Sequence, residues 1–120
     1  MTAVAEMRAA GGGARIFCAD KPAYSCIPPE VRALAAERGW ETFVLTGFST
    51  HACVLKTALD IFEAGWRPVL MEDLCASHNG LELHTSALII LGKLIGADNI
   101  VASEAVRPAS MSSIVRRARI

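Results

Sequence analysis

Short apolar runs alternate with longer amphipathic segments along this sequence, and no other feature constrains the fold as strongly. Runs rich in β-branched and aromatic residues predict strands at 15–19, 42–47, 67–73 and 99–103. Segments with apolar residues at helical spacing predict helices at 26–40, 52–65 and 82–96. Strands that alternate with single helices join a parallel sheet through right-handed crossovers. We therefore expect an α/β domain whose mainly parallel sheet lies between helices on both faces, a three-layer α/β/α arrangement.

Composition limits the class of protein further. The 120 residues are 52% hydrophobic and 20% charged, which is typical of one globular domain. The formal net charge of zero argues against a nucleic-acid partner. The sequence contains no apolar run of about eighteen residues and no secretory signal, so we expect no membrane partner and a cytoplasmic location.

The cysteines are Cys18, Cys26, Cys53 and Cys75. They show no C-x-x-C spacing and no paired histidine, so the sequence predicts no metal site, and we expect no cofactor. In the cytosol these side chains are expected to be reduced thiols. Three of them are most simply interpreted as small buried hydrophobic residues, whereas Cys53 lies in a stretch that indicates chemistry.

The chain is expected to divide into three regions. Residues 1–14 end in three consecutive glycines and are interpreted as a flexible N-terminal segment. Residues 15–106 hold the predicted strands and helices, and residues 107–120 form a tail. The tail carries Arg116, Arg117 and Arg119, which we interpret as solvated, with a contact to another subunit as the alternative.

Cys53 lies where a predicted strand has ended and a predicted helix begins. Backbone N–H groups at a helix start point outward and the helix dipole favours an anion there, so the position stabilises a thiolate. A thiolate is a nucleophile, and the same N–H groups can bind the oxygen of a tetrahedral intermediate. Lys21 follows the first predicted strand, and its side chain is expected in the same cleft, since the carboxyl ends of parallel strands meet at one edge. Taken alone, the position of Cys53 also fits a structural cysteine.

A second pattern indicates a serine nucleophile. The stretch GFSTH begins like the G-x-S-x-G elbow of serine hydrolases, which would make Ser49 the nucleophile. Asp73 and then His78 or His84 follow in the order that such a triad requires. The final glycine of the elbow is replaced by His51, and the upstream oxyanion-hole segment is absent.

The segment from 46 to 78 resembles the signature of the isochorismatase-like cysteine hydrolases, the superfamily that includes nicotinamidases and N-carbamoylsarcosine amidohydrolase. The signature reads G-x-x-T-x-x-C-V before a helix, and the matching residues are Gly47, Thr50, Cys53 and Val54. DKPAYSC at 20–26 resembles the segment that carries the catalytic lysine of the family, which corresponds to Lys21. The pattern from His84 to Val101 resembles the closing helix and strand, so the resemblance covers about residues 15–105.

This resemblance implies a Cys–Lys–Asp triad that hydrolyses an amide-type C–N bond of a small molecule. Cys53 would attack the carbonyl carbon, and Lys21 would stabilise the thiolate and the intermediates. The backbone N–H groups of Ser49 and Cys53 would form the oxyanion hole, after a cis peptide bond between Phe48 and Ser49. The branch that cleaves isochorismate typically lacks the cysteine, so the resemblance favours the amidase-like branch.

The third catalytic residue of the family, an aspartate at the end of its first strand, has no counterpart before Lys21. Asp20 adjoins the lysine outside that motif, Asp60 lies within a helix, and Asp73 ends a different strand. The metal-binding Asp/His cluster of nicotinamidases and two central strands of the family sheet are also missing. We therefore expect a partial hydrolase domain that lacks the first strands, with little activity alone and a tendency to form homo-oligomers. A truncated or decayed copy, acting only as a subunit or not at all, is the alternative interpretation.

The remaining candidates have weaker patterns. Asp73 matches an aspartate that shapes the site in the family, and capping of a loop explains it equally well. Tyr24 and Phe48 are expected either to line a substrate pocket beside Cys53 or to belong to the core. His51 is interpreted as a surface residue, and capping or solvent exposure is the expected state of His78 and His84.

Overall fold

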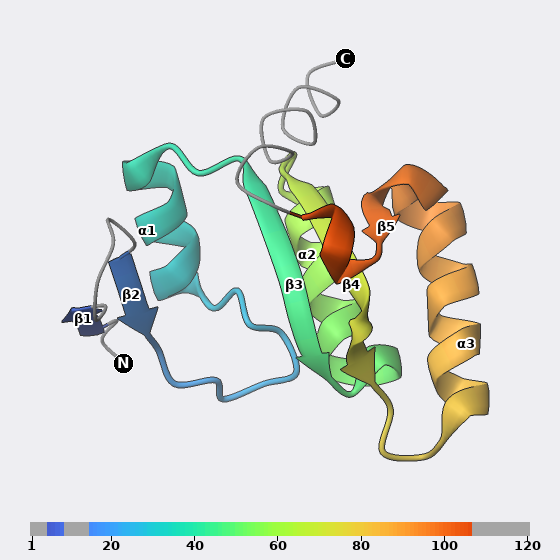
Figure 1. Ribbon diagram of the computed structural model, residues 1–120. Coiled ribbons are helices and arrows are strands. Elements are labelled where there is room, and N and C mark those ends of the chain that lie inside the picture. The colour runs from blue at the N-terminus through green and yellow to red at the C-terminus, as the bar shows by residue number, and fades with distance from the viewer. Residues whose placement is uncertain (1–4, 9–14, 107–120) are drawn as a thin grey trace.

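The computed structural model describes residues 5–8 and 15–106 (Figure 1). The predicted solvated arginines at 116–119 and the rest of the predicted N-terminal segment and C-terminal tail lie outside the described residues. The strands are β1 (Ala5–Arg8), β2 (Arg15–Cys18), β3 (Thr42–Phe48), β4 (Arg67–Ala76) and β5 (Ile100–Val101). The α-helices are α1 (Pro29–Arg38), α2 (Leu55–Glu63) and α3 (Leu81–Leu91). A π-helical turn, Thr50–Val54, precedes α2, and a second one, Gly92–Gly96, follows α3. Short 3₁₀ turns lie at Ala97–Asn99 and Ser103–Ala105.

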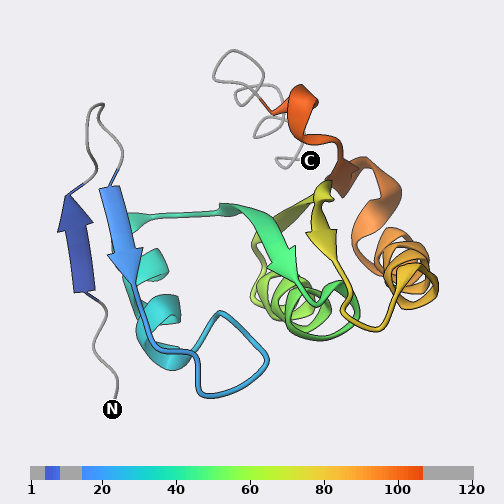
Figure 2. The ribbon, with the colours of Figure 1, turned by 60° about the horizontal axis from the view of Figure 1, so that its bottom comes forward.

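The larger sheet has the order β3-β4-β5, and both pairings are parallel. Thr42 pairs with Arg67 and Leu70 pairs with Ile100, while a register shift between Leu45 and Gly47 interrupts the β3–β4 ladder. Helices α2 and α3 lie side by side on one face of this sheet (Figure 2). The predicted α/β class and the parallel sheet are confirmed.

Strand β2 is not part of that sheet, contrary to the sequence prediction. It pairs antiparallel with β1, a strand that the sequence did not predict. The apolar side chain of Phe17 packs against helix α1 instead, with its ring 5.6 Å from that of Trp40 and the Arg38 guanidinium 5.4 Å above it. The hairpin and α1 lie together beyond the β3 edge of the larger sheet (Figure 1).

Helix α1 forms as its sequence predicts. Pro29 occupies its first turn, where the missing N–H costs no hydrogen bond. Gly39 ends it in the left-handed region, with a φ of 70°, and its N–H group faces the carbonyls of Ala35 and Ala36. Of the apolar face predicted for this helix, Ala35 is fully buried and the larger residues are half-buried.

The β-branched and aromatic content of residues 42–47 predicts a buried strand, but β3 is not buried. None of its residues is buried, and Thr46 and Phe48 are exposed. The reason is its place in the sheet: among the described residues β3 has a strand neighbour on one side only. An edge strand keeps one row of backbone groups and the flanks of its side chains open.

The core lies between the sheet and helices α2 and α3. Its buried cluster comprises Val54, Ala58, Leu70, Cys75, Leu91 and Ile95. On α2 the sequence predicted Phe62 in the apolar face, but Phe62 is 48% exposed and Ile61 is fully buried. Apolar residues occupy neighbouring positions along this helix, so periodicity alone did not determine which of the two faces the sheet.

Candidate active site

The chain turns sharply between β3 and α2. Gly47 has a φ of 126°, and the peptide bond between Phe48 and Ser49 is cis, which confirms the bond predicted from the family resemblance. The carbonyl of Ser49 then accepts hydrogen bonds from the N–H groups of Ala52 at 3.1 Å and Val54 at 3.2 Å. These contacts start the π-helical turn that contains Cys53, so this residue lies where the strand has ended and the helical segment begins.

Lys21 contacts Cys53 directly. Its Nζ lies 3.4 Å from Cys53 Sγ and donates to the carbonyls of Ala23 at 2.8 Å and Tyr24 at 3.3 Å. The three N–H groups of the ammonium thus have three partners, and one of them is the thiol. The predicted proximity of Lys21 and Cys53 is confirmed. The predicted route is wrong, however, because Lys21 lies on the loop that follows the β1–β2 hairpin, not at the end of a strand of the same sheet.

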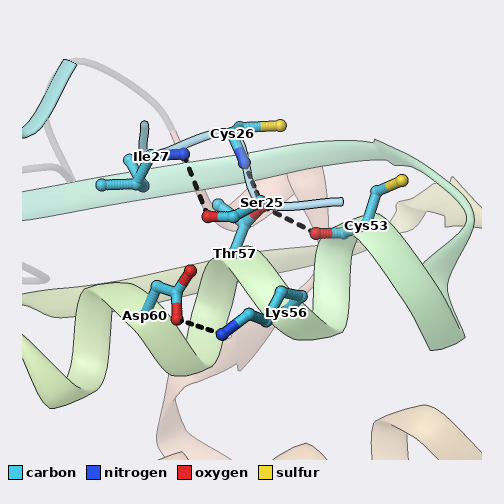
Figure 3. Close-up of polar contacts among 7 residues, drawn as sticks. All are labelled: Ser25, Cys26, Ile27, Cys53, Lys56, Thr57 and Asp60. Atoms are coloured by element: carbon cyan, nitrogen blue, oxygen red, sulfur yellow. Dashed lines mark hydrogen bonds and ion pairs between the residues drawn. The ribbon is translucent and has the colours of Figure 1, made fainter. Parts of the chain in front are cut away.

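This loop is attached to the start of α2 through Thr57 (Figure 3). The N–H group of Cys26 donates to Thr57 Oγ1 at 2.8 Å, and the same hydroxyl donates to the carbonyl of Cys53 at 2.6 Å. Thr57 is 2% exposed. Thr57 was not singled out from the sequence, although a threonine one turn after Cys53, on the helix face that also carries Val54 and Ile61, was a possible signal.

Asp60 belongs to a second attachment between the loop and α2. Its carboxylate accepts a hydrogen bond from Lys56 Nζ at 2.7 Å and one from the Ser25 side chain. Burial acts to raise the pKa of Asp60, but these two hydrogen bonds and the Lys56 charge outweigh it and hold the pKa below its ordinary value. Ser25 also accepts a hydrogen bond from the N–H group of Ile27 at 3.1 Å, which shapes the loop.

Asp73 has a partner away from the thiol. Its carboxylate accepts hydrogen bonds from the N–H and hydroxyl groups of Ser103, and these lower the pKa of Asp73. Asp20 is exposed beside Lys21. Within residues 15–106, no carboxylate is hydrogen-bonded or ion-paired to Lys21 or Cys53.

All three histidines bind hydroxyl groups around the β3–α2 junction. His78 Nδ1 is hydrogen-bonded to Ser49 Oγ, and His84 Nδ1 lies 2.8 Å from Thr50 Oγ1. His51 Nδ1 lies 2.9 Å from Ser77 Oγ, so it is half-buried rather than a free surface residue. The solvent exposure expected of His78 is confirmed, whereas His84 is half-buried and contacts Thr50 instead of facing solvent. The sharp turn at Ser49 directs the hydroxyls of residues 49 and 50 toward these two histidines.

Tyr24 and Phe48 are 68% and 74% exposed, so neither belongs to the core. Tyr24 lies on the loop that carries Lys21, and Phe48 lies directly before the cis bond. Among the described residues, no group of three His, Cys, Asp or Glu side chains could hold a metal ion. A metal site of the nicotinamidase kind therefore does not fit these residues.

The described part of the chain also contains no helix long and apolar enough to cross a bilayer.

A thiol in the turn between a parallel strand and its following helix, with an ammonium beside it, defines an α/β protein with a candidate nucleophilic site. Residues 10–97, well over half of the chain, match the isochorismatase domain. The chain belongs to the isochorismatase family.

Known proteins agree with this assignment. Isochorismatase family protein 2A of Dictyostelium discoideum is 35% identical over 69 residues, which are 56% of this chain and 34% of that protein. The pyrazinamidase/nicotinamidase of Streptococcus mutans matches with a TM-score of 0.63 and 35% identity, over 68% of this chain and 45% of that one. The nicotinamidase of Bacillus subtilis matches with a TM-score of 0.61 and 32% identity, over 68% and 44% of the two chains. This chain therefore spans about a third of the curated relative and less than half of these solved proteins.

Proposed function

We propose that Cys53 is the nucleophile of a hydrolase that cleaves an amide-type C–N bond of a small molecule. The observation that carries this proposal is the 3.4 Å contact between Lys21 Nζ and Cys53 Sγ, which joins residues 32 positions apart in the sequence. An ammonium beside a thiol favours the thiolate, which is the reactive form. The structural neighbours from Streptococcus mutans and Bacillus subtilis are nicotinamidases, and this supports an amide substrate.

In the proposed reaction the thiolate of Cys53 forms a bond to the carbonyl carbon of the amide. The backbone N–H groups of Ser49 and Cys53 hold the oxygen of the tetrahedral intermediate, and the positive charge of Lys21 stabilises it. The C–N bond then breaks, the amine leaves with a proton taken from solvent water, and a thioester remains on Cys53. Water cleaves this thioester and releases the carboxylic acid and the free thiol.

The residues around the pair have supporting roles in this proposal. Tyr24 and Phe48 offer exposed aromatic rings to the substrate. Gly47 permits the turn that ends β3, and Thr50, which is fully buried and hydrogen-bonded to His84, holds the segment after it. Asp73 has a structural role, since it anchors Ser103 at the end of the described chain.

Proton transfer to the leaving amine requires a group that the described residues do not supply beside Cys53. General acid–base catalysis contributes on the order of a hundredfold or more, so we propose that residues 1–120 alone turn over amides slowly. Acyl transfer to Cys53 from a donor with a good leaving group does not need this proton. Such a donor therefore tests whether Cys53 is the nucleophile without requiring a group that protonates the leaving amine.

The test uses the p-nitrophenyl ester of nicotinic acid and records the acyl adduct by intact-protein and peptide mass spectrometry. We expect one adduct on Cys53, none in Cys53→Ala, and slower formation in Lys21→Ala. Cys18→Ala serves as the matched control, because Cys18 is an exposed thiol on β2, and we expect the adduct to form at the unmodified rate. An adduct that forms equally well in Cys53→Ala would overturn the proposal.

Ser49 is the second candidate nucleophile, because its Oγ is hydrogen-bonded to His78 Nδ1. Two observations weigh against it: Ser49 is only 4% exposed, and the carboxylate of Asp73 binds Ser103 rather than a histidine. The peptide that carries the acyl group distinguishes the two candidates. An adduct mapped to Ser49 and lost in Ser49→Ala would establish the serine mechanism.

A further inference from the structure

We infer that Thr57 is a positioning residue that holds Lys21 against Cys53. This inference rests on the proposed function, since it concerns the geometry of the same pair. Thr57 does not contact the thiol or the ammonium. It acts through the loop that carries Lys21 and through the helical turn that carries Cys53 (Figure 3).

A single oxygen atom joins these two segments. Thr57 Oγ1 accepts the hydrogen bond from Cys26 N–H at 2.8 Å and donates its own hydrogen to the Cys53 carbonyl at 2.6 Å. A hydroxyl can fill both roles at once, whereas a methyl group of the same size can fill neither. At 2% exposure the site is closed to solvent, so water cannot replace the hydroxyl without a rearrangement.

The other contacts of the loop do not replace this link. The bonds from Lys21 Nζ to Ala23 and Tyr24 lie within the loop and only shape it. The Ser25 contact with Asp60 reaches α2 one turn further from Cys53 than Thr57 does. Without the Thr57 hydroxyl, the loop is released at the point nearest to Cys53, and the ammonium can move away from the sulfur.

The experiment compares Thr57→Val, which keeps the shape and removes the hydroxyl, with Thr57→Ser, which keeps the hydroxyl. The readout in the full chain is the rate of Cys53 alkylation by iodoacetamide at several pH values between about 6 and 9, with Cys18 as internal reference. At neutral pH we expect Thr57→Val to slow Cys53 roughly as much as Lys21→Ala does, and Thr57→Ser to stay within about twofold of the unmodified chain. The double variant Lys21→Ala/Thr57→Val should be no slower than Lys21→Ala alone, because both changes remove the same contact.

The outcomes separate this inference from the proposed function. If Lys21→Ala leaves the Cys53 rate unchanged, the proposed thiolate–ammonium pair is wrong, and the inference falls with it. If Lys21→Ala slows Cys53 but Thr57→Val does not, Thr57 only packs the helix; the inference is then overturned and the proposed pair stands. If Thr57→Val lowers the melting temperature but leaves the Cys53 alkylation profile unchanged, the inference is likewise overturned and the proposed pair stands.

A second measurement covers the case in which Thr57→Val does not fold. Hydrogen exchange of the Cys26 amide is followed in the unmodified chain, with the amide of Ala23 as a reference in the same loop. A bond to a buried hydroxyl predicts slow exchange at Cys26. Exchange at the rate of an exposed loop amide would show that the loop is not held by Thr57, and would overturn the inference.

Discussion

At the scale of single residues, exposure and charge predict opposite orders of cysteine reactivity. Cys18 and Cys26 are exposed, Cys53 is half-buried, and Cys75 is buried. Burial raises the pKa of the Cys75 thiol, so this residue should react last. Exposure alone would then place Cys53 third, whereas the Lys21 ammonium beside it predicts that it reacts first.

We expect iodoacetamide at neutral pH to modify Cys53 faster than the two exposed cysteines, on the order of tenfold. Peptide mass spectrometry over a time course measures all four rates in one sample. Lys21→Ala should remove the advantage of Cys53, while Lys93→Ala, which removes an exposed lysine outside the site, should preserve it. Equal rates at Cys18, Cys26 and Cys53 in the unmodified chain would contradict the assigned site.

At the scale of elements, the junction between β3 and α2 depends on a backbone conformation that favours glycine. Gly47 has a φ of 126°, and a Cβ added there would meet no atom within 4 Å, so the cost of a side chain is backbone strain rather than a clash. We expect Gly47→Ala to lower the free energy of unfolding by about 1–3 kcal/mol, measured by urea denaturation.

Gly92 provides the matched control for this substitution. It follows α3 with a φ of −57°, and an added Cβ would make an ordinary 3.7 Å contact with Ile100. Alanine should therefore be neutral at this position or stabilise by about 0.5–1 kcal/mol. Equal effects of the two substitutions would show that the turn at Gly47 does not require its conformation.

At the scale of the whole molecule, β3 is the edge of the parallel sheet in the part of the chain that the structure describes. An edge strand with open backbone groups recruits other chains, so we expect concentration-dependent association. Thr46→Lys adds a charge at an exposed position of β3 and should reduce the mass measured by light scattering. Thr85→Lys adds the same charge on an exposed position of α3 and should not. A chain that stays monomeric at all concentrations, or equal effects of both variants, would contradict a role for this edge.

Those parts of the candidate site that depend on short sequence motifs could be predicted. The position of Cys53 at the start of a helical segment and of Lys21 after a strand predicted that the two lie in one cleft. The cis bond after Phe48 was implied by the resemblance of Gly47, Thr50 and Cys53 to the family signature. Thr57 could not be predicted in the same way. Its role depends on a loop about thirty residues earlier in the chain. The pattern of α2 places Thr57 on the buried face of the helix, but it does not indicate which group the hydroxyl contacts there.

The sequence by itself determined the order of strands and helices from β2 onward, the parallel pairing of β3, β4 and β5, and the place of Cys53 between β3 and α2. These features follow from periodicity, β-branched content and the glycines that end each element, all of which act over a few residues. Only the tertiary structure decided that β2 pairs with β1, that Ile61 rather than Phe62 faces the sheet, and that the histidines bind hydroxyls at the turn. Each of these depends on which surfaces meet. Phe17 packs against Trp40, which follows α1, and only one of two adjacent apolar positions on α2 faces the sheet.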